Sequence, residues 1–181
     1  MSSSNNQDPI VVRFTGRKRR KVWCRTDYET TGADGRGVGL MLDGRGALFA
    51  IFTTDGTQGL PSEDFRRFTG GGWIGSYGRG GGAKVSVLAR IGTKKGNALR
   101  GTFIKAVLSN GDANTLVVEG IDYSGRDIRV RAQSYFRPLG VDGKPIDTET
   151  SCGGATGSPF RYEVILKRDL SAAKKATCSP Y

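Results

Sequence analysis

The sequence contains no histidine among its 181 residues. This absence removes the Ser-His-Asp and Cys-His nucleophilic machineries, the commonest general base, and most catalytic zinc sites. Catalysis would then need a carboxylate pair or lysine chemistry. The neighbouring acids Asp27 with Glu29, and Glu63 with Asp64, have no spacing that places a pair across a cleft. We therefore expect a protein that is not an enzyme and that has no metal site and no cofactor.

Cysteine and long apolar runs are also scarce. Cys24, Cys152 and Cys178 are too few for a disulfide scaffold and lack a zinc-binding spacing. Cys152 and Cys178 pair if their strands meet, whereas three free thiols fit a reducing compartment. No apolar run approaches the ~18 residues of a membrane span, and the polar start lacks the apolar stretch of a signal peptide. These signals predict a cytoplasmic chain, with a mature form of an exported protein as the alternative.

Acidic residues are missing from two long stretches, Pro9–Thr26 and Phe65–Gly111, in a chain of net charge +11. Segregated positive charge attracts anionic partners and says little about the fold. The candidate residues for such a partner are Arg17, Lys18, Arg19, Arg20, Lys21, Arg66, Arg67, Arg79, Lys84, Arg90, Lys94 and Lys95. The first five form a block that we place in a hairpin turn opened by Gly16. The alternative is a basic protein that its charge merely keeps soluble.

Glycine is abundant, with 28 positions, and favours tight turns over helices. Apolar residues alternate with period two, as in half-buried strands, and Asp-Gly or Asn-Gly pairs mark the turns between them. The predicted strands are Ile10–Phe14, Lys21–Arg25, Gly37–Leu42, Leu48–Thr53, Lys84–Ile91, Leu99–Ala106, Thr115–Ile121, Ile128–Gln133 and Phe160–Lys167. Helix is confined to one turn over Glu63–Arg67, capped by Ser62, and a short terminal helix over Asp169–Lys175. The chain is thus an all-β protein of antiparallel hairpins, with a polar arm over residues 1–8 and a single domain over 9–181.

The predicted hairpins repeat with an offset of about 78 residues. Gly37–Ala50 is echoed by Thr115–Val130, and the pair of strands that begins at Val85 is echoed from Tyr162 onward. The chain therefore consists of two hairpin-pair units after a leading half unit. Such duplication suggests stacked or radial β architecture: a β-sandwich, a barrel or propeller-blade-like sheets.

Trp23–Tyr28 followed by Gly37–Ala50 resembles the bacterial seven-bladed-propeller repeat, in which a Trp-containing strand and a loop precede a glycine-aspartate hairpin and an aromatic strand. Thr53–Gly59 with Gly70–Trp73 is similar to uncharacterised cyanobacterial secreted or surface β proteins. The resemblance implies a rigid binding scaffold at the cell surface or outside the cell, without a catalytic residue to transfer. Since a propeller needs about four to eight blades, either the sheets fold on each other or several chains complete one assembly.

The loop over residues 70–82 combines eight glycines with Trp73, Tyr77 and Arg79. Flexible backbone, two aromatic rings and an arginine suit a platform on which bases or sugars stack, or an interface with another subunit. The alternative is a structural loop whose aromatic side chains fill the core.

These observations predict a non-enzymatic structural or assembly protein. Its basic surfaces would pack into a homo-oligomer, a filament or a complex with acidic proteins. One alternative is a nucleic-acid-binding protein that uses the acid-free stretch and the glycine-aromatic loop. Another is a surface module that binds anionic polysaccharide.

Overall fold

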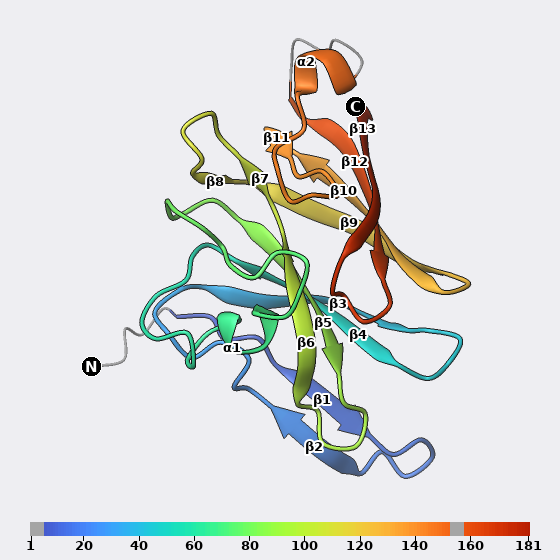
Figure 1. The fold of residues 1–181 in the computed structure, drawn as a ribbon. Coiled ribbons are helices and arrows are strands. Elements are labelled where there is room, and N and C mark those ends of the chain that lie inside the picture. Colours follow the sequence, from blue (N-terminus) through green and yellow to red (C-terminus); the bar gives the residue numbers. More distant parts are fainter. Residues whose placement is uncertain (1–5, 153–157) are drawn as a thin grey trace.

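The computed structural model describes residues 6–152 and 158–181 (Figure 1). The described chain contains strands and two one-turn helices. They are β1 (Val11–Phe14), β2 (Lys21–Arg25), β3 (Gly35–Leu42), β4 (Leu48–Thr54), α1 (Arg66–Thr69), β5 (Val85–Ile91), β6 (Ala98–Ile104), β7 (Ala106–Val107), β8 (Ala113–Asn114), β9 (Leu116–Ser124), β10 (Asp127–Ser134), β11 (Arg137–Pro138), α2 (Thr148–Ser151), β12 (Phe160–Lys167) and β13 (Ala173–Pro180).

Two four-stranded antiparallel sheets form the body of the molecule. The first sheet has the order β3-β4-β5-β6 and the second the order β9-β10-β12-β13. Their facing sides share one apolar cluster, in which Phe49 and Leu88 of the first sheet join Val130 and Val164 of the second. The predicted all-β fold is therefore confirmed.

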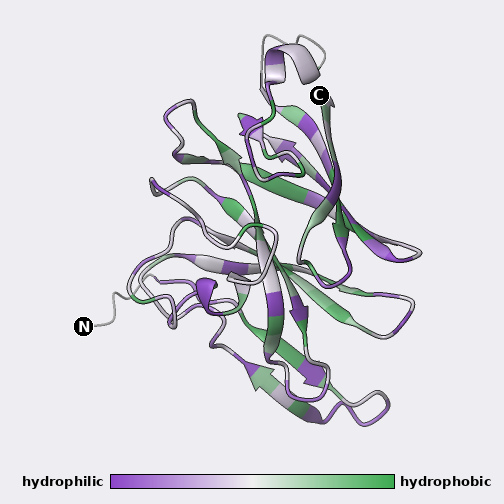
Figure 2. Cartoon of the chain, in the orientation of Figure 1, coloured by the Kyte–Doolittle hydropathy of each residue, from purple (hydrophilic) through white to green (hydrophobic). Residues whose placement is uncertain are grey.

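The two sheets differ in how they are covered. The central strands of the first sheet, β4 and β5, are buried on both faces, because a second apolar cluster packs Phe52 and Phe103 against Trp23, Tyr28 and Phe65 from segments outside the sheet. β5 is accordingly almost wholly buried. β10 buries only alternate residues, as a strand with one solvated face does. Figure 2 shows hydrophobic residues on the strands of both sheets and hydrophilic residues at most hairpin tips.

Each predicted strand corresponds to an observed one, with shifted ends at several. The predicted strand over Leu99–Ala106 is divided into β6 and β7. The same strand order in both four-stranded sheets is what a duplication would produce. The 78-residue sequence period itself stays a prediction.

The predicted terminal helix over Asp169–Lys175 is wrong. A tight turn follows β12, with Leu170 at a φ of +62° and Asp169 accepting hydrogen bonds from the backbone and hydroxyl of Ser171. The chain then returns as β13, which pairs with β12 over its length. Pairing with a sheet edge here overrides the helix propensity of an Ala/Lys-rich segment.

The predicted helical turn at Glu63 starts later than expected. α1 begins at Arg66, and its N-cap Phe65 makes no side-chain cap, so the predicted cap by Ser62 is wrong. The Asp64 carboxylate accepts from the Arg66 backbone N–H at 2.8 Å and so replaces the serine at the start of the turn.

The described parts of the two terminal segments are bonded to the body. The predicted arm, residues 1–8, lies largely outside the described residues. Its described part is bonded, because the Gln7 carbonyl accepts from Gly35 N–H at 2.7 Å. Cys152, just after α2, forms a disulfide with Cys178 on β13, with their Cα atoms 4.8 Å apart, which confirms the pairing alternative. Cys24 is a free, exposed thiol. No helix in the described ranges has the length and apolarity needed to cross a bilayer.

Candidate anion-binding surface

The basic block forms the tip of the β1–β2 hairpin. β1 ends at Phe14 and β2 begins at Lys21, and the Thr15 N–H donates to the Arg20 carbonyl at 2.8 Å across the turn. Arg19 has a φ of +44°, a left-handed conformation that costs a non-glycine residue roughly 1–2 kcal/mol. The turn therefore holds its cations outward, where all of them are exposed.

The turn between β5 and β6 lies against this hairpin (Figure 1). The Trp23 indole N–H donates to the Thr93 carbonyl at 3.0 Å, and the Arg13 guanidinium donates to the same oxygen. Gly96 has a φ of +75°, and a Cβ there would lie 2.6 Å from the Trp23 ring. This close approach needs glycine, and it brings Lys94 and Lys95 beside the hairpin.

Two distant stretches of sequence thus supply one cationic surface, which we call the basic end. Its members are Arg13, Arg17, Lys18, Arg19, Arg20, Lys21, Lys94 and Lys95. None of these cations takes part in an ion pair among the described residues, although nine other cations do. Asp27, beyond β2, is already paired with Arg25 at 2.5 Å, and that hydrogen bond lowers the pKa of the Asp27 carboxyl. The basic end is therefore not neutralised from within the chain.

Three other predicted cations have carboxylate neighbours. Arg66 pairs with the fully buried Asp64 carboxylate at 2.7 Å. Arg67 donates to the Asp27 carbonyl and lies 3.9 Å from its carboxylate. Arg79 lies 3.5 Å from Asp112. These three arginines hold loops together.

Two further predicted cations lie apart from the basic end. Lys84 precedes β5, at the opposite end of that strand from Lys94, and seven residues of strand span roughly 23 Å. Arg90 is half-buried on β5 and faces Phe49 and Arg100 of the neighbouring strands. Only some of the predicted cations thus belong to the basic end. Arg13 belongs to it too, although it was not among the predicted residues. Its position in the first acid-free stretch could have identified it from the sequence.

The glycine-aromatic loop is a structural element. Tyr77 is fully buried, its hydroxyl donates to the Ala83 carbonyl at 2.7 Å, and burial raises its pKa. Its predicted role in stacking on a partner is therefore wrong, because the ring belongs to the core. Trp73 is half-buried against the cluster between the sheets, and its indole N–H donates to Val141.

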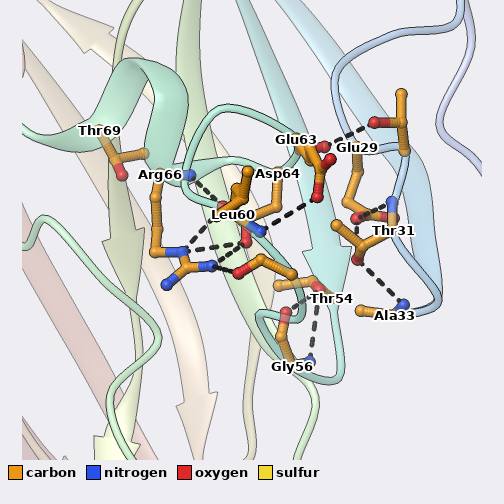
Figure 3. Close-up of polar contacts among 12 residues, drawn as sticks. Glu29, Thr31, Ala33, Thr54, Gly56, Leu60, Glu63, Asp64, Arg66 and Thr69 are labelled. Carbon is orange, nitrogen blue, oxygen red and sulfur yellow. Dashed lines mark hydrogen bonds and ion pairs between the residues drawn. The ribbon is translucent and has the colours of Figure 1, made fainter.

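The acidic residues considered for catalysis organise loops (Figure 3). Glu29 is buried, accepts from the backbone and hydroxyl of Thr31, and has a pKa raised by burial. Glu63 accepts from the Leu60 N–H at 3.0 Å. Asp64 binds the Arg66 guanidinium with both oxygens. Each carboxylate thus bonds to groups of its own loop, and only the second oxygen of Glu29, Oε2, is buried without a partner among these contacts.

The outer face of the second sheet is also charged, but its charges are mixed. Arg131 pairs with Asp122 at 2.7 Å, and Arg129 lies 3.6 Å from Glu163. A shallow depression of about 350 Å³ on this face is lined by both signs, with Glu119 beside Arg131. This face has no surplus of one charge comparable with the basic end.

Comparison of the chain with known protein families, curated proteins and solved structures finds no match. The likeness to the propeller repeat therefore stays a prediction, and the functional argument depends on the surfaces described above.

Proposed function

We propose that this protein is a non-enzymatic assembly subunit that packs against an acidic protein partner through its basic end. The observation that carries the proposal is the convergence of eight cations from two acid-free stretches on one end, without an internal carboxylate partner among the described residues. Such a surface produces a field that speeds and orients association with an anionic surface.

The structure of the basic end also supports a binding role. The β1–β2 hairpin is held by Trp23 over Gly96 and by the Tyr28 hydroxyl, which donates to the Gly96 carbonyl at 2.5 Å. A cation on such a support loses less conformational freedom on binding than one on a loose tail. The scaffold therefore presents its cations as one positioned group.

The choice of an acidic protein over nucleic acid follows from the aromatic residues. Single-stranded nucleic acids are bound by cationic grooves together with exposed aromatic rings on which bases stack. Tyr77 is in the core, and Trp23 at the basic end is only 9% exposed. Phe14 is the one exposed ring of the described basic end, at 56%, and a single ring gives no series of stacking positions for successive bases. The main feature of this end is therefore its charge, which suits a carboxylate-rich protein surface.

The test compares two triple variants. In the first, Lys18→Gln, Arg19→Gln and Arg20→Gln neutralise the hairpin tip. In the matched control, Arg129→Gln, Arg131→Gln and Lys174→Gln remove the same charge from the second sheet. Polyglutamate, heparin and single-stranded DNA serve as probes in titrations at rising salt. We expect the hairpin variant to bind polyglutamate roughly 10- to 100-fold more weakly, and the control to stay within about threefold of wild type.

Three results would contradict the proposal. Equal losses in both variants would mean that net charge, and no particular surface, drives binding. Heparin or DNA bound far more tightly than polyglutamate, at the same charge and salt, would favour the polysaccharide or nucleic-acid alternative. A monomer purified from its source without an acidic partner would argue against an assembly role.

A further inference from the structure

The first sheet has an edge strand that no other part of the described chain covers along its apolar stretch. β3 is last in the strand order and pairs only with β4. Its side chains Val38, Leu40 and Leu42 are 52%, 58% and 68% exposed. An unpaired strand edge with apolar side chains is a template for another strand, so proteins usually protect such edges with charge, proline or a covering segment.

Two of the other edges carry such protection. β6 is covered by the segment after α1, where the Phe103 N–H donates to the Ile74 carbonyl at 2.9 Å. β13 has the exposed Lys174 and Lys175 near one end and Pro180 at the other.

The edge at β9 is protected as well, because Glu119 and Asp122 are exposed there and a bulge interrupts its pairing with β10. β3 differs from all three edges. From Gly37 to Leu42 it contains no charged residue and no proline, and its bulge at Val38 lies at the start of this stretch. Four residues beyond the bulge remain in regular register and open on their outer side.

A groove runs along this open edge, between β3 and β1. Two depressions of about 330 and 360 Å³ meet at Val11 and Leu40, which line both of them. The first extends to Phe14 and Leu42, and the second to Val38. β1 pairs with β2 alone, so its side toward the groove is unpaired too. The lining is mostly apolar, and the flanking strand edges offer backbone hydrogen bonds.

The ends of the groove differ in charge. Arg13 lines the depression at Phe14, and the hairpin tip of the basic end follows directly in the sequence. At the other end the charges are mixed, because Asp34 accepts from the Gln7 N–H at 3.2 Å and the neighbouring Arg36 donates to the Gln7 side chain. An occupant would therefore place negative charge beside Phe14 and Leu42.

We infer that the groove binds an extended segment of the acidic partner, which adds to β3 as a further strand. Main-chain hydrogen bonds supply affinity in this mode of recognition, and pockets for alternate side chains supply specificity. A second copy of this chain would bring its own charge of +11 to the same place, which disfavours self-pairing. An antiparallel segment, the more stable arrangement, would start beside Leu42, so its acidic residues would precede its apolar ones. The inference rests on the proposed function and names the segment that the partner contributes.

Two fluorescent peptides of equal composition test whether the groove binds an extended acidic segment in this orientation. The peptide DEDVTVTV has the acidic residues first, and VTVTVDED has them last. In anisotropy titrations we expect the wild-type protein to bind the first at least 10-fold more tightly. The double variant Leu40→Asn with Leu42→Asn should lose at least 10-fold in affinity. The matched variant Leu99→Asn with Val141→Asn, at residues that are 54% and 48% exposed elsewhere, should bind as wild type does. Circular dichroism checks that all variants are folded.

The outcomes separate this inference from the proposed function. If the groove variant binds DEDVTVTV as tightly as wild type does, or if the two peptides bind equally, the groove inference is wrong. Loss of polyglutamate binding in the hairpin variant would still leave the proposed function standing. A dimer in sedimentation velocity that the groove variant dissolves, without peptide binding, would also overturn the inference, since the occupant would then be a second copy.

Discussion

The basic end and the outer face of the second sheet are both rich in arginine and lysine, but they use these residues differently. On the sheet face, strand pairing places carboxylates within reach of cations, as for Arg131 with Asp122. At the basic end, two acid-free stretches meet and no such partner exists among the described residues. Arginine and lysine thus form ion pairs within the chain on the sheet face. At the basic end they form an unpaired surface that can meet a partner. Counting charges along the chain would not distinguish them.

The largest expected effect comes from a substitution that disturbs the geometry of the basic end. Gly96→Ala places a Cβ against Trp23 at a φ of +75°, whereas Gly46→Ala meets open space at a φ of +77°. The matched conformations separate backbone strain from the clash. We expect Gly46→Ala to lower the free energy of unfolding by about 1 kcal/mol, and Gly96→Ala by about 3 kcal/mol because overpacking is added. Urea denaturation measures both values.

Gly96→Ala should also weaken polyglutamate binding, because a displaced Trp23 no longer holds the hairpin beside Lys94. Gly46→Ala should leave that binding unchanged. Equal stability and equal binding in the two variants would show that the hairpin is not held by this contact.

The second prediction removes the charged partner of a paired cation. The Asp43 carboxylate in the β3–β4 turn is fully buried, pairs with Arg168 of the β12–β13 turn, and so links the two sheets. Hydrogen bonding to Arg168 lowers the Asp43 pKa from 3.8 to about 2. Asp43→Asn can still accept from the Ala47 N–H but loses the charge, so we expect a loss of about 2 kcal/mol at pH 7.

The pH dependence follows from the lowered pKa. A carboxyl with a lower pKa in the folded state stabilises fully above its unfolded value and loses this contribution as the pH falls through the folded value. The stability difference between wild type and Asp43→Asn should therefore shrink between about pH 4 and pH 2. Urea titrations across this range measure it, and a constant difference would mean that the ion pair is not its source.

The smallest expected effects are changes in stability that differ in sign between the two regions. Arg131→Gln removes a partner of Asp122 on an exposed surface and should cost less than about 1 kcal/mol. Arg19→Gln removes one of several neighbouring like charges, so it should leave stability unchanged or raise it by a few tenths of a kcal/mol at low salt. Unfolding at low and high salt compares them, and a clear loss for Arg19→Gln would reveal an internal partner.

Much of the fold was predictable because it depends on local patterns. Period-two alternation predicted strands such as Phe160–Lys167, and Gly16 with five successive cations predicted a hairpin tip. The terminal segment was mispredicted because Asp169–Lys175 is rich in alanine and lysine, as exposed helices are, whereas the residues from Ala173 onward form a strand through pairing with the edge of β12. Local propensity cannot report a partner strand.

The candidate site was predictable only in part. The hairpin cations were identified, but Arg66 and Arg79 looked equivalent to them until Asp64 and Asp112 were located. Tyr77 resembled a binding residue because glycines surround it, and its burial depends on segments packed over the first sheet. The exposed edge at β3 was invisible, since Leu40 and Leu42 have the pattern of a core strand.

By itself, the chain of residues determined that this protein is built from antiparallel hairpins and that its positive charge is concentrated in two stretches. Both properties can be read from short stretches of sequence, because alternation depends on near neighbours and charge depends on residue type. Only the tertiary structure decided which cations stand together without partners, which aromatic rings are hidden, and which strand is left open. These depend on contacts between residues such as Trp23 and Gly96, which lie far apart in the chain and meet only when the sheets pack.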